Sequence, residues 1–252
     1  MTASPDLPFP SLAGRQPTPR ADGEASRQRL MQAGLRLFAL QGFARTSIRE
    51  LALAAEVNVA AISYYFGDKA GLYRAVFFEP CGNPADDIAR FADPALPLAD
   101  ALAGFYQAFL DPLSMGEDGY LSVKLRMHEM LEPTGLWSEE IRQGIQPMHD
   151  ALVALLCRHL ALSEPDDDTH RLAVCLSALA VHLHVGRDVT DVVAPQLNQP
   201  ADAVQQWGRF LTVQAVAMVQ ADHARRVASQ LPGDPQTAAQ LLPAFPTPQT
   251  QP

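Results

Sequence analysis

The sequence is poor in the features that define several large classes of protein. Its three cysteines, Cys81, Cys157 and Cys175, are odd in number and form no C-x-x-C pair, which indicates reduced thiols rather than a disulfide framework. No run of about 18 apolar residues occurs, so we expect no contact with a membrane. The N-terminal stretch lacks the basic segment and apolar core of a secretion signal. These absences predict a cytoplasmic protein.

Motifs for enzyme chemistry and metal binding are missing as well. The sequence contains no P-loop, dinucleotide fingerprint or nucleophile elbow. His182 and His184 would face different directions on a helix, and His128-Glu129 is not followed by the second histidine of a zinc protease motif. Cys175 and His182 share a helix face, which leaves a metal or redox role open as an alternative. We therefore predict no enzyme activity, no cofactor and no resident metal.

The charge of the chain is acidic overall but unevenly distributed. The formal net charge is −9, which by itself argues against a nucleic-acid partner. Residues 24–80, however, hold seven Lys/Arg against five Asp/Glu, whereas residues 81–252 hold ten against twenty-one. The acidic excess therefore lies outside residues 24–80, and any contact with nucleic acid is expected there.

The hydrophobic pattern predicts an all-α fold with two domains. Apolar residues recur at helical spacing, and no stretch alternates as a strand does. Prolines and small polar residues predict a disordered N-terminal arm over 1–23 and a disordered tail over 231–252. Turn-forming residues over 80–97 predict a boundary between an N-terminal domain, 24–80, and a larger helical domain, 81–230.

Helix signals divide both domains further. Ser47 and Glu50 have the spacing of a capping box, Asn58 and Asp68 are natural N-caps, and Pro147 should kink or split the helix that contains it. The expected helices are 25–41, one beginning after Ser47, 59–66, 69–79, 98–111, 118–131, 137–162, 167–188 and 201–229.

The segment over 46–69 is the most informative part of the chain. It predicts two short helices joined by a tight turn, with Leu51, Ala54 and Ala55 of the first helix facing the core. Many proteins use a two-helix unit of this shape to place side chains in the major groove of DNA. The sequence therefore predicts a helix-turn-helix domain whose partner is double-stranded DNA.

The order of residues in this region closely resembles the N-terminal domain of TetR-type (tetracycline-repressor family) transcriptional regulators. The resemblance covers about 50 of the 252 residues. The stretch AAISYYFGDKAGLYRAV, residues 60–76, is also similar to the branch whose regulators carry a CecR-type C-terminal domain. The matching positions are Leu37-Phe38, Gly42-Phe43, Thr46-Ser47, Leu51-Ala52, Ala55, Val57, Ile62, Tyr64-Tyr65-Phe66, Lys69 and Leu72-Tyr73.

Candidate DNA contacts come partly from physical chemistry and partly from the resemblance. Hydroxyls at the start of the second helix suit phosphate, and small residues at the tip of the third suit close approach to thymine methyl groups. The resemblance implies that Lys69 binds phosphate and that the tyrosines contact phosphate or sugar. Arg49 contacts DNA or is merely an exposed charge, and Tyr65 alternatively packs on the fourth helix. The candidates are Thr46, Ser47, Arg49, Asn58, Val59, Ala60, Ala61, Ser63, Tyr64, Tyr65 and Lys69.

One position departs from the family pattern. The family usually places glycine at the turn position that is Glu56 here. If this residue is left-handed, glutamate costs about 1 kcal/mol relative to glycine. It also puts a negative charge near the groove, which bears on affinity for DNA rather than on the fold.

The resemblance implies that the C-terminal helices dimerise and bind a small-molecule effector. A homodimer fits a palindromic operator, because two reading helices must reach successive major grooves. The helical pattern offers two apolar rows for a four-helix interface. One row is Leu172, Leu176, Leu179 and Leu183, and the other is Phe210, Val213, Ala217 and Val219.

An effector pocket is expected between the helices from 98 to 188. Each candidate residue is alternatively a surface or satisfied polar group. The protein as a whole is predicted to be a repressor that the effector releases from DNA. The alternative is a helical small-molecule-binding protein or enzyme with a vestigial DNA-binding domain. The candidate pocket residues are Arg126, His128, Met130, Trp137, Cys175 and His182.

Overall fold

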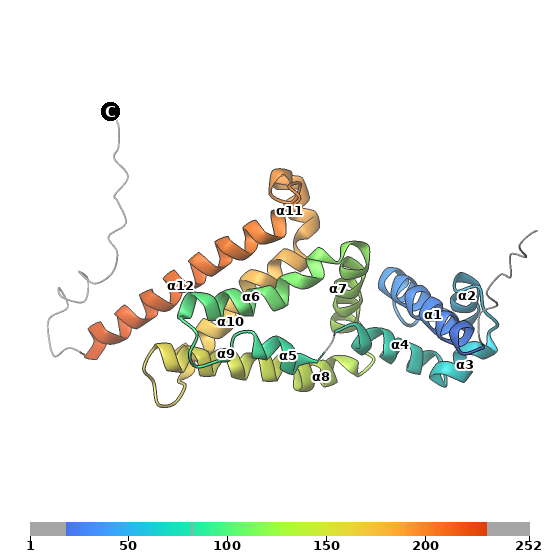
Figure 1. Cartoon of the computed structure of the whole chain (residues 1–252), viewed down its shortest axis with the longest axis horizontal. Helices are drawn as coiled ribbons and strands as arrows, with labels where there is room; N and C mark the ends of the chain where they lie inside the picture. The colour runs from blue at the N-terminus through green and yellow to red at the C-terminus, as the bar shows by residue number, and fades with distance from the viewer. Residues whose placement is uncertain (1–18, 82, 231–252) are drawn as a thin grey trace, which may run out of the picture.

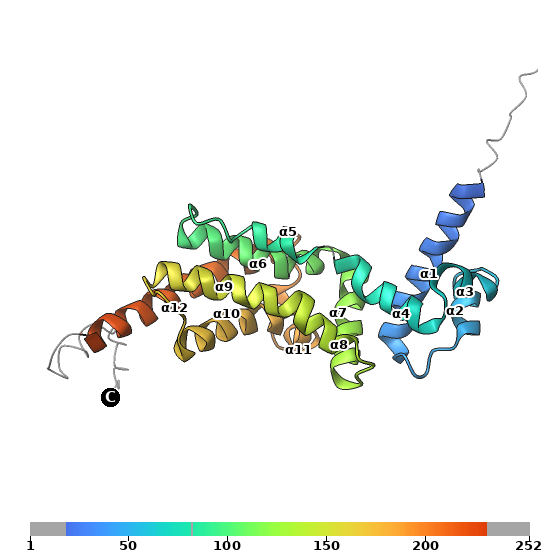
Figure 2. The ribbon, with the colours of Figure 1, turned by 90° about the horizontal axis from the view of Figure 1, so that it is seen from below.

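The computed structural model describes residues 19–81 and 83–230, and every regular element in these ranges is helical. The elements are α1 Pro19–Gln41, α2 Ile48–Ala54, α3 Ala60–Phe66, α4 Lys69–Phe78, η1 Glu79–Cys81, α5 Pro84–Ala89, α6 Leu98–Ser114, α7 Gly116–Leu131, α8 Leu136–Glu140, η2 Ile141–Ile145, α9 Gln146–His159, α10 Asp167–Val185, α11 Arg187–Val193, η3 Pro195–Leu197 and α12 Ala203–Gln230. The molecule is elongated, with α1–α4 at one end, α6, α9, α10 and α12 at the other, and α7 between them (Figure 1, Figure 2). The all-α fold with a helix-turn-helix unit is confirmed.

The first core lies among α1, α2, α3, α4 and α7. Phe38 of α1, Leu51 of α2 and Ile62 of α3 are buried in it. Leu121 and Leu125 of α7 belong to the same cluster. The predicted domain boundary near residue 80 is therefore not the boundary of this core, because a helix from the C-terminal part completes it.

The second core lies among α6, α9, α10 and α12. Aromatic residues of α6 fill its centre, and the Tyr106 hydroxyl donates a hydrogen bond to the Leu176 carbonyl of α10 at 3.2 Å. Burial raises the pKa of Tyr106, so this phenol remains a donor throughout the neutral range. The hydrogen bond satisfies the one polar group that Tyr106 brings into an apolar interior.

Several helix limits differ from the expectation. α1 begins at Pro19, so part of the predicted disordered arm is helical, whereas 1–18 and 231–252 lie outside the described residues. The boundary segment 80–97 contains α5, which the Asn83 side chain caps. A short helix, α11, follows Gly186 and was not predicted. These short elements lack the long apolar period on which helix prediction depends.

Two finer expectations have opposite outcomes. The predicted break at Pro147 is confirmed, because the 137–162 stretch divides into α8, a π-helical turn and α9, with Pro147 in the first turn of α9. The expected core position of Ala54 is wrong. Ala54 is exposed and Ala52 is buried, because the inner face of α2 is centred on Leu51 and Ala55.

An ion-pair network joins the start of α10 to the end of α12. The Arg226 guanidinium contacts the Asp166 carboxylate at 2.6 Å and the Asp222 carboxylate at 2.5 Å. Asp166 also caps α10 by accepting from the Thr169 N–H at 2.8 Å. These hydrogen bonds hold the pKa of Asp166 well below its usual range. The two longest C-terminal helices are thereby tied together at the end far from α1–α4.

A buried carboxylate connects the two parts of the molecule. Glu129 of α7 is fully buried and accepts from the Tyr73 hydroxyl of α4 at 2.9 Å. It also accepts from the Thr134 N–H at 2.8 Å and the Trp137 N–H at 3.2 Å, both beyond the end of α7. Burial, and then the neighbouring carboxylate, raise the pKa of Tyr73 and keep it a donor. The side chain of Glu129 therefore acts as a hydrogen-bond acceptor toward Tyr73, Thr134 and Trp137.

Glu129→Gln is expected to lower the free energy of unfolding by about 2–3 kcal/mol, because an amide NH₂ would face donors that a carboxylate accepts. Urea denaturation measures the change. Glu132→Gln, one turn away and exposed, is the matched control and should change stability by less than about 0.5 kcal/mol. Equal effects of the two substitutions would contradict the role given to Glu129.

Within residues 19–81 and 83–230, no single helix is long and apolar enough to cross a membrane. α10 and α11 meet the same test of length and composition only as a pair that bends by 73° at Gly186.

Candidate nucleic-acid interface

The start of α2 is fixed by the predicted capping box, which is confirmed. The Ser47 hydroxyl oxygen accepts from the Glu50 N–H at 3.2 Å, and the Glu50 carboxylate accepts from the Ser47 N–H at 2.8 Å. Hydrogen bonds that the Glu50 carboxylate accepts from the Ser47 side chain and from the Ser47 backbone N–H lower the pKa of Glu50. The Ser47 side chain is exposed.

Thr46 does not lie on the surface as expected. It is 1% exposed, and its hydroxyl donates to the Gly42 carbonyl at 2.8 Å. The predicted phosphate contact of this hydroxyl is therefore wrong for this conformation. Thr46 closes the loop between α1 and α2, because Gly42 ends α1 in a left-handed conformation and leaves its carbonyl to be satisfied.

Lys69 holds the same loop from the other side. Its ammonium donates to the Phe43 carbonyl at 2.8 Å and to the Thr46 carbonyl at 2.9 Å. It also lies 4.1 Å from the centroid of the Phe43 ring, a cation–π distance. Two of its three N–H groups are thus used inside the protein. The main role of Lys69 in this structure is to hold the loop between α1 and α2. One N–H of its ammonium remains for a phosphate.

The turn between α2 and α3 contains the left-handed residue that the sequence suggested at Glu56. Glu56 has φ of +53°, in the left-handed region, so the departure from glycine does carry strain. The turn is closed by Val57 N–H donating to the Ala52 carbonyl at 3.0 Å. Arg29 of α1 donates to the Ala55 carbonyl at 2.9 Å and holds the end of α2. Nothing in the local pattern indicated this second contact.

α3 presents a small, exposed face. Tyr64 is 82% exposed and Val59 is 39% exposed, whereas Ile62 on the opposite side is buried. The Asn58 side chain accepts from the Ala60 N–H at 2.9 Å, but the N-cap of α3 is Val59, so α3 starts one residue later than predicted. Tyr65 is half-buried, with its ring 4.8 Å from that of Tyr64. The face therefore combines an exposed aromatic ring with small side chains.

The predicted DNA-contacting residues divide into three groups by exposure. Arg45, immediately before Thr46, is also exposed and was missed, although an arginine preceding Thr-Ser at a helix start was a usable signal. Thr46 is buried, and Ala61, Tyr65 and Lys69 are half-buried. The exposed group is Ser47, Arg49, Asn58, Val59, Ala60, Ser63 and Tyr64.

Comparison with known families extends this geometry. Residues 30–76 match the model of bacterial regulatory proteins of the tetR family. Residues 98–221 match the model of the C-terminal domain of the HTH-type transcriptional dual regulator CecR. The chain belongs to the tetR family of bacterial regulatory proteins. Its C-terminal domain is of the CecR type, as the stretch over 60–76 indicated.

Individual relatives agree with this family. CecR of Shigella flexneri is 30% identical over 147 residues, which cover 53% of this chain and 64% of that protein. The HTH-type regulator AcrR of Shigella flexneri is 36% identical over 58 residues, covering 23% of this chain and 27% of that protein. The matches thus span less than two thirds of the length of these relatives.

Solved structures agree at the level of the fold. A transcriptional regulator from Pseudomonas aeruginosa PAO1 superposes with a TM-score of 0.59 at 17% identity, covering 80% of this chain and 94% of that one. A complex of SmeT with triclosan has a TM-score of 0.57 at 19% identity, covering 77% and 90%.

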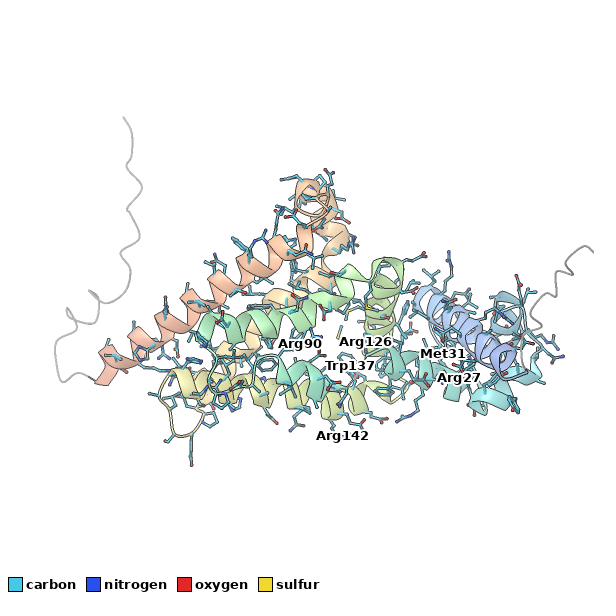
Figure 3. All side chains as sticks on the ribbon, viewed as in Figure 1. Arg27, Met31, Arg90, Arg126, Trp137 and Arg142 are labelled. Atoms are coloured by element: carbon cyan, nitrogen blue, oxygen red, sulfur yellow. The ribbon has the colours of Figure 1, made fainter. Side chains whose placement is uncertain are left out.

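The predicted effector residues of this TetR-family protein do not gather around one cavity. Arg126 and Trp137 lie at the junction of the two parts (Figure 3), where Arg126 stacks 5.0 Å from the Phe77 ring and Trp137 packs on the first core. Met130 is 45% exposed, and Cys175 and His182 are exposed on α10. His128 lines a cleft at the junction. Helical period places a residue on a face but does not say which faces meet.

Metal binding by these side chains finds no support in the described part of the chain. No group of three or more His, Cys, Asp and Glu side chains there is arranged to hold an ion. His184 is half-buried on α10, whereas His182 is exposed. The Nε2 of His184 lies 2.7 Å from the Phe109 carbonyl, and burial lowers its pKa and keeps it neutral.

Glu56→Gly is expected to raise the free energy of unfolding by about 1 kcal/mol, because glycine adopts a left-handed backbone without the side-chain clash. Thermal or urea unfolding measures it. Ala161→Gly, at φ of +54° between α9 and α10, is the matched control with the same backbone gain and no change of charge. Stabilisation by Ala161→Gly alone would show that the Glu56 side chain compensates its own strain.

Proposed function

We propose that this protein is a transcriptional repressor that binds a palindromic operator as a homodimer and is released by a small-molecule effector. The observation that carries the proposal is the exposed face of α3. Tyr64, Ser63 and Ala60 are exposed there while Ile62 anchors the helix in the first core. A large aromatic side chain left 82% exposed beside small residues is suited to sugar, phosphate and base-edge contacts.

Charge around this face supports the same role. Arg45 and Arg49 flank the start of α2 and are exposed. The Lys69 ammonium adds positive potential between α1 and α4 even though its donors are partly used. Contacts of this kind fix orientation on DNA without reading sequence, and they make affinity depend on salt.

A homodimer is supported by apolar side chains exposed on α10 and α12. Val174, Val181 and Val185 of α10, and Phe210 and Val213 of α12, are between 40% and 63% exposed. They recur at helical spacing along one side of each helix, as an interface between helix pairs requires. The stripe predicted on α10 was wrong, since Leu176 and Leu183 are buried in the protomer's own core.

The row predicted on α12 is exposed only in part. Phe210, Val213 and Ala217 are exposed, but Val219 is 2% exposed and belongs to the second core. The interface we propose therefore uses the α10 row centred on Val181 together with Phe210, Val213 and Ala217.

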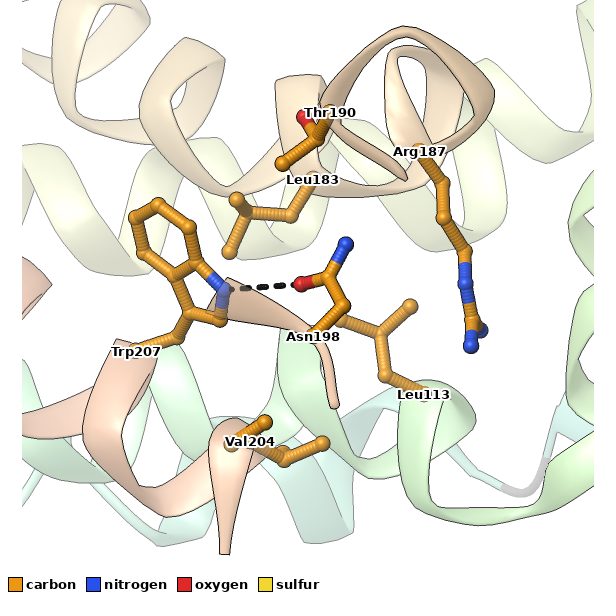
Figure 4. Close-up of a pocket in the computed structure, with 8 residues that line it drawn as sticks. Leu113, Leu183, Arg187, Thr190, Asn198, Val204 and Trp207 are labelled. Atoms are coloured by element: carbon orange, nitrogen blue, oxygen red, sulfur yellow. Dashed lines mark hydrogen bonds between the residues drawn. The ribbon is translucent and has the colours of Figure 1, made fainter. Parts of the chain in front are cut away.

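The effector is proposed to bind inside the C-terminal domain. The Nδ1 of His184 is buried without a hydrogen-bond partner in the described chain, so it is a polar group open to a ligand. Separately, a pocket of about 40 Å³ lies among α6, α10, α11 and α12, with Arg187, Asn198 and Trp207 on its walls (Figure 4). It must widen to admit a ligand the size of triclosan, which the related fold of SmeT binds.

Release from DNA then follows from linkage. An effector that opens the C-terminal core changes the packing of α7 and, through Tyr73 and Glu129, the placement of α1–α4. The two reading faces of the dimer no longer match successive major grooves. The effector must bind the released form more tightly than the DNA-bound form, since a ligand with equal affinity for both shifts nothing.

A second candidate function is a helical small-molecule-binding protein with a vestigial DNA-binding domain. It rests on Glu56, which adds strain and negative charge at the turn. It predicts only weak, sequence-independent retention of DNA.

Arg49→Ala is expected to lower the slope of log K against log salt by about 0.9, the loss of one phosphate contact. Fluorescence anisotropy with DNA from upstream of the gene measures the slope at salt concentrations from about 50 to about 200 mM. Arg209→Ala, an exposed arginine of α12, is the control and should leave the slope unchanged. Binding that neither Arg49→Ala nor Tyr64→Ala weakens would favour the second candidate.

Val213→Asp is expected to convert the dimer to a monomer, because each buried, unpaired charge costs about 3–5 kcal/mol. Light scattering after gel filtration measures the mass, which is 27.3 kDa for one chain. Leu53→Asp, an 81% exposed leucine on α2, should remain dimeric. A wild-type mass of one chain would refute the dimer.

A further inference from the structure

A cleft of about 310 Å³ lies between the two parts of the molecule, separate from the pocket in Figure 4. Gly42 and Phe43 contribute the loop after α1, Tyr73 comes from α4, and His128 and Glu132 come from the end of α7. The volume is at the lower limit of small-molecule sites. Its walls therefore belong half to the helix-turn-helix unit and half to the C-terminal domain.

One side of the cleft is aromatic. The Phe43 and Tyr73 rings lie 4.9 Å apart with their planes tilted by 49°. Phe43 is half-buried and Tyr73 is 2% exposed, so Phe43 supplies most of the apolar wall that the cleft offers to a flat apolar group. Gly42, at φ of +80°, keeps the adjoining wall free of a side chain.

The other side of the cleft carries a carboxylate and an imidazole. A Cβ built on Gly42 would lie 3.7 Å from both the Glu132 Oε2 and the His128 Nδ1, so the two groups converge at one point. Neither side chain has a hydrogen-bond or ion-pair partner among residues 19–81 and 83–230. Two polar groups one helical turn apart are thus aimed at the cleft without being used by the fold.

The position of Glu132 is itself unfavourable for an unpaired carboxylate. It is the C-cap residue of α7, where the unpaired carbonyls of the last turn carry partial negative charge. A cation beside Glu132 would relieve both the side-chain charge and the helix end. The Lys69 ammonium, which lies on the Phe43 ring, is already held by two carbonyl oxygens.

We propose that this cleft binds a small organic cation that carries an aromatic group. The ammonium lies between the Glu132 carboxylate and the His128 ring, and the aromatic group lies against Phe43 and Tyr73. Occupancy ties the loop after α1 to the end of α7, so the cation favours one placement of the helix-turn-helix unit over others. By linkage, DNA and the cation then alter each other's affinity. This last step, and not the site itself, rests on the proposed DNA binding.

Titration of the full-length protein with 2-phenylethylammonium, followed by saturation-transfer NMR, tests the site. A fragment of this size is expected to bind in the millimolar range. Glu132→Gln should weaken binding at least tenfold, because it removes the charge and keeps the shape. Asp118→Asn, an exposed carboxylate in the first turn of the same helix, should leave the affinity unchanged. The neutral 2-phenylethanol should bind at least tenfold more weakly to the wild type.

Absence of saturable binding by the wild type would overturn the proposal, as would equal affinity in Glu132→Gln and Asp118→Asn. The same titration with operator DNA present separates the two proposals. If the protein binds the cation through Glu132 but does not bind DNA, the cation site is supported and the proposed regulatory function is refuted. Intact DNA binding without Glu132-dependent uptake of the cation would do the reverse.

Discussion

The arrangement of this protein depends on one buried charge. Glu129 of α7 lies where this helix meets α4 and α8, and it accepts hydrogen bonds from Tyr73 of α4, from Thr134 between α7 and α8, and from the Trp137 backbone N–H of α8. A carboxylate in an apolar interior is tolerated only when donors surround it. The requirement is mutual, because Tyr73 and Trp137 would lose their acceptor if α7 moved. The helix-turn-helix unit is therefore coupled to the C-terminal domain through a contact that resists partial displacement.

Local features of the helix-turn-helix unit could be predicted from the sequence, but its long-range contacts could not. The Ser47–Glu50 capping box and the strained turn at Glu56 depend on neighbours a few residues away. Thr46 and Lys69 were assigned to phosphate because their residue types and the family pattern suit it. In the structure Lys69 reaches back 26 residues to the Phe43 carbonyl. Such a contact is set by tertiary packing, which no short pattern contains.

The C-terminal domain shows a different limit of sequence reasoning. α10 has apolar residues on two sides, with Leu176 and Leu183 along one and Val174 and Val181 along the other. Both rows satisfy the period of a helix, so the period alone does not say which faces the protomer's own core. The larger leucines fill the interior and the smaller valines remain outside. The scatter of the effector candidates has the same origin, because Cys175 and His182 lie on the exposed side of α10 whereas Trp137 packs on the first core.

The share of α7 in the first core has a consequence for how such proteins are recombined. Leu121 and Leu125 are packed among side chains of α1–α4, although they lie some 40 residues beyond the end of α4 in the chain. A fragment that contains α1–α4 and ends after residue 80 would expose the apolar surface that these two leucines cover. A chimera that exchanges DNA specificity between relatives must therefore include the α7 residues that pack on α1–α4, or its designer must redesign this contact. The two domains of this protein therefore meet at α7, one side of which belongs to the core of α1–α4, and not at a flexible linker.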